Sequence, residues 1–434
     1  MRMYDLIHKK KEGKELTREE IEFFVSGVTT GEIPDSQTAA LLMAICLKDM
    51  NEREATDLTI AMLSSGAVAD LSAIDGIKAD KHSTGGVGDS TTPVVIPAVA
   101  ACGIKMAKMS GRALGHTGGT VDKLESVPGT RTDLSPEEFA STVNKVGAAV
   151  IAQTGMLCPA DKKLYALRDF TATVENNALI ASSIMSKKLA SGADIIMLDV
   201  KYGSGAFIKS PEDALKLARL MVKIGEGAGR KVGAVISSMD VPLGHAVGNA
   251  LEMYEASDML QGKMIADKYE VCVALSAGIL TLSGACSGDE AKAIIEEKIR
   301  SGEAFSKLCE MLEAQGGDTT ELRCPEKRRY APIRYELKAE QCGYIGAMNT
   351  EEIGLSEGML GASRSALDGK IDFLAGIEIL KKTGDKVSPD DTIAVLHTSN
   401  EALIAPAAQR LRAAIEITGE KTERPSVIYA TVGV

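Results

Sequence analysis

The chain reads IKADKHSTGGVGDSTT between residues 77 and 92. Residues 77–82 are predicted to form a short strand, and the apolar segment after Thr92 is predicted to be helical. Because glycine has no Cβ, backbone N–H groups can converge in the turn between them, and the helix N-terminus adds unpaired N–H groups. Lys81 contributes a positive charge. These features favour a phosphate site, although turn geometry alone would also explain the glycines.

A second glycine-rich loop follows the next predicted strand, residues 104–109. The loop reads SGRALGHTGGTVDKLE and spans residues 110–125. Residues 194–200 and 231–237 are further apolar runs, typical of buried parallel strands. Loops at the carboxyl ends of neighbouring parallel strands face one crevice, which is the usual ligand site of an open α/β sheet. We therefore expect the two loops to form one site.

Neither loop matches a standard nucleotide motif. No Gly-Lys-Ser/Thr follows the glycines, and the G-x-G-x-x-G fingerprint of dinucleotide binding is missing, which argues against a nicotinamide oxidoreductase. Within the second loop, Arg112, Asp122 and Glu125 are expected to form an ion pair that holds the loop rather than to bind a ligand.

The two loops interrupt a helical unit. Residues 1–65 carry capping signals and apolar side chains at helical spacing, and residues 160–191 return to the same pattern. We therefore expect an α/β fold with a discontinuous all-helical lobe (1–65 and 160–191). A larger α/β lobe with a mixed, mostly parallel sheet is expected over 70–155 and 192–330, and a C-terminal α+β domain over 331–434.

Composition excludes several classes of function. The 434 residues include 49 Lys and Arg against 60 Asp and Glu, a net charge of −11, with 4% aromatic residues and no Trp. A broad surface for nucleic acid or anionic lipid is therefore not expected. No apolar run approaches about 18 residues, so no membrane span is expected. Eight cysteines without a C-x-x-C pair predict no thiolate zinc site and favour the reducing cytoplasm.

Three motifs together point to one family. Residues 81–89, residues 110–125, and Arg168 followed by SSIMSKK at 182–188 resemble the thymidine/pyrimidine-nucleoside phosphorylase family, and the resemblance covers essentially the whole chain. It implies a homodimeric pentosyltransferase that catalyses reversible phosphorolysis. Inorganic phosphate would attack C1′ of a pyrimidine nucleoside and release the base and a (2-deoxy)ribose 1-phosphate of inverted configuration.

The resemblance also implies roles for individual residues. Phosphate would be bound by Lys81, Ser83, Thr92, Lys108, Ser110 and Thr120, and the nucleoside by Tyr165, Arg168, Ser183 and Lys187. Arg168 and Lys187 are cations aimed at the departing base, where negative charge develops, so they would be catalytic. His82 is a candidate proton donor to the base, although a loop histidine oriented by a neighbour would look the same.

The family resemblance further implies a bound monovalent cation, K⁺ or a similar ion, one per subunit, and no organic cofactor. Its ligands would come from Gly88, Ser90, Leu243, Ala246 and Glu255. Leu243 and Ala246 can contribute main-chain oxygen alone, and Glu255 without the resemblance would be interpreted as an exposed helix acid.

Substrate range and reaction class have alternatives. Lys108 resembles the broad-specificity members, so activity on uridine, deoxyuridine and thymidine is expected, and a strict thymidine phosphorylase is the alternative. A phosphoribosyltransferase of the same fold would depend on phosphoribosyl diphosphate and Mg²⁺ instead of orthophosphate. A non-catalytic nucleoside- or phosphate-binding protein is a third possibility, against which Lys81, Arg168 and Lys187 argue together.

Overall fold

A computed structural model of the chain describes residues 1–113, 115–153, 157–363 and 370–434. Leu114 of the second glycine-rich loop therefore lies outside the described residues. The helical lobe contains α1 (Met3–Lys11), α2 (Arg18–Thr30), α3 (Asp35–Lys48), α4 (Glu52–Ser64), α8 (Pro159–Phe170) and α9 (Asn177–Ala190). Capping boxes at Thr17 and Asn51 start α2 and α4, as the sequence predicts. Two segments far apart in the chain thus share one lobe.

The α/β lobe is built on one sheet with strand order β13-β5-β4-β1-β2-β3. Its strands are β1 (Lys78–Ser83), β2 (Lys105–Ser110), β3 (Ala148–Ala152), β4 (Ile195–Tyr202), β5 (Lys231–Ser238) and β13 (Ile428–Val432). Strands β1 to β5 pair in parallel, whereas β13 is antiparallel to β5. Every residue of β4 is buried, which explains why its sequence is apolar apart from Asp199, Lys201 and the terminal Tyr202. The expected mixed, mostly parallel sheet is confirmed.

Helices cover both faces of this sheet. They are α5 (Thr92–Ala100), α6 (Thr120–Glu125), α7 (Pro136–Val146), α10 (Pro211–Gly227), α11 (Asn249–Leu260), α12 (Ala266–Ser283), α13 (Gly288–Arg300), α14 (Glu303–Ala314) and α15 (Thr320–Arg323), with the 3-10 turn η1 (Pro325–Lys327). One hydrophobic core joins α5, α11, α12 and α14 to one face of the sheet, and a second joins α10 and the helical lobe to the other. The sheet is therefore buried between two helical layers.

The C-terminal domain consists of short antiparallel strands and two helices. Its elements are β7 (Ile333–Lys338), β8 (Gly343–Met348), β9 (Gly376–Ile379), β10 (Lys386–Val387), β11 (Thr392–Thr398), β12 (Ile415–Thr418), α16 (Thr350–Glu357), α17 (Ile404–Ala413), the π-helical turn η2 (Gly358–Ala362) and η3 (Glu401–Leu403). Strand β6 (Ala246–Val247) of the α/β lobe pairs antiparallel with β9. The domain therefore holds the loop before α11 directly.

The last strand departs from the expected domain range 331–434. Strand β13 leaves the C-terminal domain and pairs with β5 in the large sheet, where Val432 packs against the core that α10 covers. The physical reason is that β5 is otherwise an edge strand with unpaired backbone groups, which β13 satisfies. The local sequence gave no sign of this long-range pairing.

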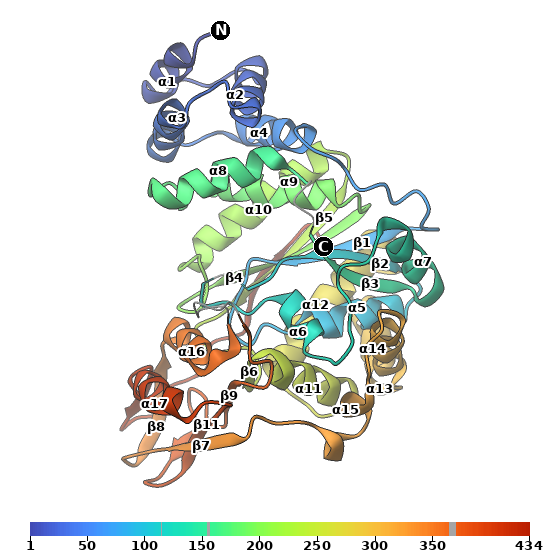
Figure 1. Cartoon of the computed structure of the whole chain (residues 1–434), viewed down its shortest axis with the longest axis vertical. Coiled ribbons are helices and arrows are strands. Elements are labelled where there is room, and N and C mark those ends of the chain that lie inside the picture. Colours follow the sequence, from blue (N-terminus) through green and yellow to red (C-terminus); the bar gives the residue numbers. More distant parts are fainter. Residues whose placement is uncertain (114, 154–156, 364–369) are drawn as a thin grey trace.

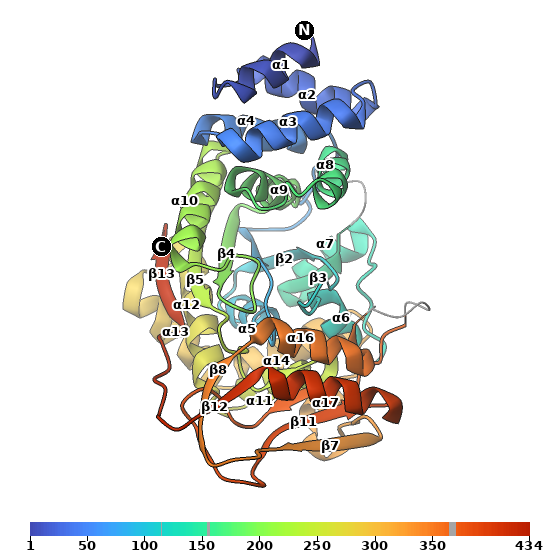
Figure 2. The ribbon, with the colours of Figure 1, turned by 90° about the vertical axis from the view of Figure 1, so that its left-hand side faces the viewer.

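Figure 1 shows the helical lobe at one end, the C-terminal domain at the other, and the sheet between them. Figure 2, turned by 90°, shows α8 and α9 facing the strands β2 and β3. Within the described residues, no helix is both long and apolar enough to span a bilayer.

Candidate active site

A cleft of about 280 Å³ opens at the carboxyl ends of β1 and β2, where the helical lobe faces the sheet. Its lining includes Lys81, His82, Ser83, Asp89 and Thr92 from the first loop, Lys108, Ser110, Arg112 and Thr120 from the second, Gln153 and Phe207 from other loops, and Ile184, Lys187 and Lys188 from α9. The two glycine-rich loops therefore form one site, as expected. Every predicted phosphate ligand lies in the part of the lining that the α/β lobe contributes.

Two buried lysines form the floor of the cleft. Lys81 on β1 lies 3.1 Å from an Asp199 carboxylate oxygen and donates a hydrogen bond to Thr91 at 2.5 Å. Lys108 on β2 donates to the Lys81 carbonyl. Burial, together with the charges of Lys188 and Lys81, lowers the pKa of Lys108 to about 7 despite the nearby Asp80. An anion bound here would restore the charge of Lys108, because a negative neighbour favours the protonated form.

The first loop is braced from within by Asp89. The Ser83 hydroxyl donates to one carboxylate oxygen of Asp89 at 2.5 Å, and the Thr91 hydroxyl donates to the other at 2.8 Å. Burial opposes the charge of Asp89, but Lys201 and Lys81 hold its pKa well below the usual range. Ser83 is thus held in place before any ligand binds.

The second loop is held by the ion pair that the sequence predicts. Arg112 donates to Asp122 at 2.8 Å and to Glu125 at 2.6 and 2.9 Å, and the pKa of Arg112 is raised, chiefly by its hydrogen bonds to Glu125. Asp122 also accepts from the Ala113 N–H at 2.8 Å. These bonds fix the loop between Ser110 at the end of β2 and α6.

The opposite wall presents a lysine from the helical lobe. Lys187 of α9 donates to Asp161 at 2.5 Å and to Ser183, one helical turn earlier, at 2.9 Å. Lys187 lines the cleft, and about a third of its side chain is exposed. Ser183 is buried, and Tyr165 lies one turn before Arg168 on α8.

Arg168 lies outside the lining of the cleft. Its guanidinium donates to three backbone carbonyls, those of Thr173, Val174 and Leu179, at 3.1, 2.7 and 3.1 Å. The Tyr165 ring lies 5.7 Å from the guanidinium carbon. In this arrangement Arg168 secures the connection between α8 and α9, and its role toward a nucleoside stays a prediction.

His82 follows Lys81 near the carboxyl end of β1. Its Nε2 is buried and has no hydrogen-bond partner among the described residues. Burial lowers the pKa of His82 well below its usual value, and the positive charges of Lys188 and Lys108 lower it further. Both effects favour the neutral imidazole in the free protein.

The five residues predicted to bind a cation converge behind the first loop. A Cβ on Gly88, whose φ of +70° favours glycine, would lie 2.6 Å from the Leu243 carbonyl oxygen and 3.0 Å from that of Ala246. Glu255 on α11 accepts from the Ala246 N–H at 3.0 Å and pairs with the buried ammonium of Lys268. Within the described residues, no group of three or more His, Cys, Asp or Glu side chains is arranged to hold a metal ion.

Comparisons with known proteins agree with this geometry. The model "Glycosyl transferase family, a/b domain" matches residues 75–305, its "helical bundle domain" matches 4–66, and "Pyrimidine nucleoside phosphorylase C-terminal domain" matches 344–418. The pyrimidine-nucleoside phosphorylase of Bacillus subtilis is 50% identical, over 97% of this chain and 98% of the relative. The chain belongs to the pyrimidine-nucleoside phosphorylase family.

Two further matches mark the extent of the likeness. The pyrimidine-nucleoside phosphorylase of Geobacillus stearothermophilus is 48% identical over 99% of both chains. The crystal structure of anthranilate phosphoribosyltransferase from Thermus thermophilus matches with a TM-score of 0.58 and 19% identity, over 72% of this chain and 99% of that one. At that identity the second match shows the shared fold alone.

Several residues of the phosphorylase site escaped the sequence analysis. Asp199 and Lys201 lie within the buried strand β4, and Asp199 pairs with both Lys81 and Lys201. Lys188 crosses from the helical lobe to donate to Asp80 and to the Met109 carbonyl, each at 2.9 Å. For Asp199 and Lys201, the sequence did offer a signal: charged residues inside an otherwise apolar strand indicate buried ion pairs, because a buried charge requires a partner.

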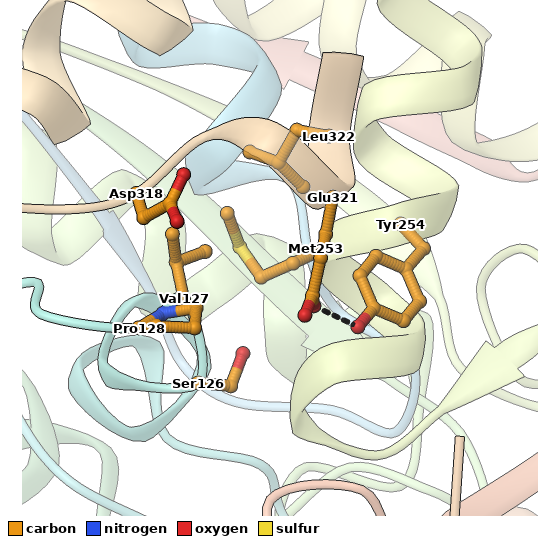
Figure 3. A pocket seen from close by; sticks show the side chains of 8 residues that line it. All are labelled: Ser126, Val127, Pro128, Met253, Tyr254, Asp318, Glu321 and Leu322. Carbon is orange, nitrogen blue, oxygen red and sulfur yellow. Dashed lines mark hydrogen bonds between the residues drawn. The ribbon is translucent and has the colours of Figure 1, made fainter. Parts of the chain in front are cut away.

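A second depression lies away from the cleft (Figure 3). It is lined by Ser126, Val127, Pro128, Met253, Tyr254, Asp318, Glu321 and Leu322, and the Tyr254 hydroxyl donates to Glu321 at 2.5 Å. Its side chains leave no room for a ligand. The cleft between the two lobes is therefore the candidate active site.

Proposed function

We infer that this chain catalyses the reversible phosphorolysis of pyrimidine nucleosides to free base and (2-deoxy)ribose 1-phosphate. The observation that supports this most directly is that lysines from both lobes line one cleft. Lys81 and Lys108 form the floor beneath two glycine-rich loops, and Lys187 faces them from the helical lobe. The relatives near 50% identity are named pyrimidine-nucleoside phosphorylases, whereas the phosphoribosyltransferase with this fold shares 19% identity.

The phosphate would lie on the wall made by the α/β lobe. We assign its binding to Lys81, Ser83, Thr92, Lys108, Ser110 and Thr120, all of which line the cleft. Gly119 lets the loop fold closely on itself, because a Cβ there would clash with the Ala113 nitrogen and the Asp122 carboxylate, and the N-terminus of α6 at Thr120 favours an anion. Bound there, one phosphate oxygen would attack C1′ while the base departs from the opposite face.

The nucleoside base would lie against the helical lobe. As the glycosidic bond breaks, the base gains negative charge, and Lys187 is a cation held in place to stabilise it. Ser183 can donate to or accept from the ring, and Tyr165 and Arg168 complete the set when the lobes close on both substrates. Closure would carry Arg168 toward the α/β lobe together with Lys187, because Arg168 on α8 is bonded to the Leu179 carbonyl of α9.

His82 would donate a proton to the base in the presence of phosphate. Its pKa is lowered in the free protein, and the negative charge of bound phosphate would raise it again. An NMR titration of the imidazole tests this idea. We expect a higher pKa with saturating phosphate than without, and an unchanged pKa would remove His82 from the acid role.

The substrate range is proposed to include uridine, deoxyuridine and thymidine. The experiment follows the ultraviolet change on base release from each nucleoside, with and without phosphate. Comparable kcat/KM values that require phosphate would support broad specificity. A uridine value hundreds of times below that of thymidine would restrict the enzyme to thymidine, and no release from either would contradict phosphorolysis.

A homodimeric, cytoplasmic enzyme is proposed as well. Tyr4 on α1 and Leu47 on α3 are 68% and 74% exposed, which is consistent with an interface on the helical lobe. All eight cysteines are free, in keeping with a reducing compartment. Sedimentation equilibrium is expected to give about twice the chain mass of 45.7 kDa, and a mass equal to one chain would exclude the dimer.

A further inference from the structure

A lysine ammonium lies among the residues expected to bind a monovalent cation. Lys268 belongs to the first turn of α12, yet its side chain is fully buried. Its Nζ donates to the Ser90 hydroxyl oxygen at 2.6 Å and to the Glu255 carboxylate. Ser90 and Glu255 are the two members of the predicted cation set that have side-chain oxygens. Both therefore already face a positive charge that the chain itself supplies.

The surrounding backbone accommodates this ammonium. Gly244 has a φ of +74°, and a Cβ there would lie 2.8 Å from the Lys268 Nζ. The second carboxylate oxygen of Glu255 accepts from the N–H groups of His245 and Ala246 at 2.6 and 3.0 Å. Both side-chain donor groups of the predicted ion site, the Ser90 hydroxyl and the Glu255 carboxylate, are thus engaged by Lys268.

We propose that the ammonium group of Lys268 takes the place of the monovalent cation in this chain. The family resemblance implies K⁺ at this position. An ammonium and a K⁺ ion each carry one positive charge and attract the same oxygen atoms. Two such charges in contact with one carboxylate repel each other at short range, so Lys268 and K⁺ compete for the position.

Lys268 links the loop that contains Asp89 and Thr92 to α11. Through Ser90, the ammonium is tied to the loop that carries Asp89 and Thr92, and through Glu255 it is tied to α11. Next to it, Lys382 of the C-terminal domain donates to the Gly244 carbonyl at 2.8 Å and to Asp267 at 2.5 Å. Lys268 is therefore a positioning residue that holds the phosphate loop without a dissociable ion.

The test compares K⁺ dependence in four proteins, the wild type and three variants, at constant ionic strength, with choline chloride replacing KCl. The readouts are the KM for phosphate and the midpoint of thermal unfolding, which does not depend on the proposed reaction. For the wild type we expect both to change little, less than about twofold in KM. Lys268→Ala removes the ammonium and opens its space, so K⁺ is expected to lower the phosphate KM and raise the midpoint.

Lys268→Met is the matched control, because it removes the charge but fills the space. We expect it to be destabilised equally in both salts, with no rescue by K⁺. Lys263→Ala, at an exposed lysine on the preceding turn, should behave as the wild type. A merely structural role for Lys268 would make the Ala and Met variants equally insensitive to K⁺, and that result would overturn the proposal.

The wild type alone also decides the question if both variants fail to fold. A midpoint that rises by several degrees when K⁺ replaces choline would show that an ion binds beside Lys268, and the proposal would be wrong. An unchanged midpoint over the same range would support it.

Discussion

The two walls of the cleft differ in how far they are organised without substrate. The wall proposed to bind phosphate, here the phosphate wall, is built by neighbouring strands, and its hydroxyl and lysine groups are braced by Asp89 and Asp199. The wall proposed to bind the nucleoside, here the nucleoside wall, comes from α8 and α9, where Lys187 faces the cleft but Arg168 is engaged by backbone carbonyls of its own lobe. Groups supplied by one rigid sheet are preorganised, whereas groups that must reach across two lobes depend on their closure.

The largest expected effect is at the nucleoside wall. Lys187→Met removes the cation that we propose stabilises the departing base, and we expect kcat/KM for uridine to fall about 100- to 1,000-fold, as when one group stabilising transition-state charge is lost. The KM for phosphate should stay within about threefold, because the phosphate wall does not include this residue. Steady-state kinetics with each substrate varied measures both.

The exposed Lys162 on α8 offers a control. Lys162→Met should leave both constants unchanged. A Lys187→Met enzyme with unaltered uridine kinetics would contradict the division of the cleft into two walls.

Arg168→Met tests the anchoring seen in the free protein. It removes three hydrogen bonds donated by a buried guanidinium, but it also removes the cost of burying that charge, so we expect the free energy of unfolding to fall by about 3 kcal/mol. Urea denaturation measures this, with the exposed Arg219→Met as control. A higher uridine KM, measured under conditions where the variant is still folded, would show a second role of Arg168 toward the nucleoside.

Lys108→Met sharpens the description of the phosphate wall. Because the pKa of Lys108 is lowered to about 7, its charge is present at pH 6 and mostly lost by pH 8.5. The phosphate KM of the variant should exceed that of the wild type by about tenfold at pH 6, and the ratio should approach one at pH 8.5. Taking the ratio cancels the titration of phosphate itself, and a constant ratio would contradict the lowered pKa.

The smallest expected effect concerns the C-terminal domain. Burial, reinforced by Glu252, raises the pKa of Glu357 on α16 to about 8. The folded protein then keeps a proton that the unfolded chain releases above about pH 4.5, so this residue lowers stability as pH rises from 5 to 8. Glu357→Gln should raise the Tm by a few degrees at pH 8 and by nothing at pH 5.

Calorimetry at the two pH values, with the exposed Glu420→Gln as control, measures the difference. An equal gain at both pH values would point to packing rather than to the proton.

Local pattern was sufficient for much of this protein. The strands near residues 78–83, 105–110, 195–202 and 231–238, and the capped helices of the first 65 residues, were predictable because hydrophobic periodicity and turn chemistry act over a few neighbouring residues. The meeting of the two glycine-rich loops in one cleft was predictable too, since the ends of parallel strands share one edge of the sheet. The ion pair of Arg112 with Glu125 was also predictable, because both residues belong to the same short stretch of sequence.

Other features depended on partners far away in the chain. The burial of Lys268 could not be predicted from the sequence, because a lysine in the first turn of a helix is ordinarily exposed. Its hydrogen-bond partner Ser90 lies 178 residues earlier in the chain. Strand β13 satisfies the edge of a sheet that begins some 350 residues before it.

The sequence by itself thus determined the elements, their order and the chemistry of the two glycine-rich loops, because these depend on contacts between near neighbours. Tertiary structure alone decided which charges became buried pairs, where Arg168 directs its donors, and which ammonium faces Glu255. The physical reason is that the cost of burying a charge is offset by a partner, and only the folded chain shows which distant residue provides it.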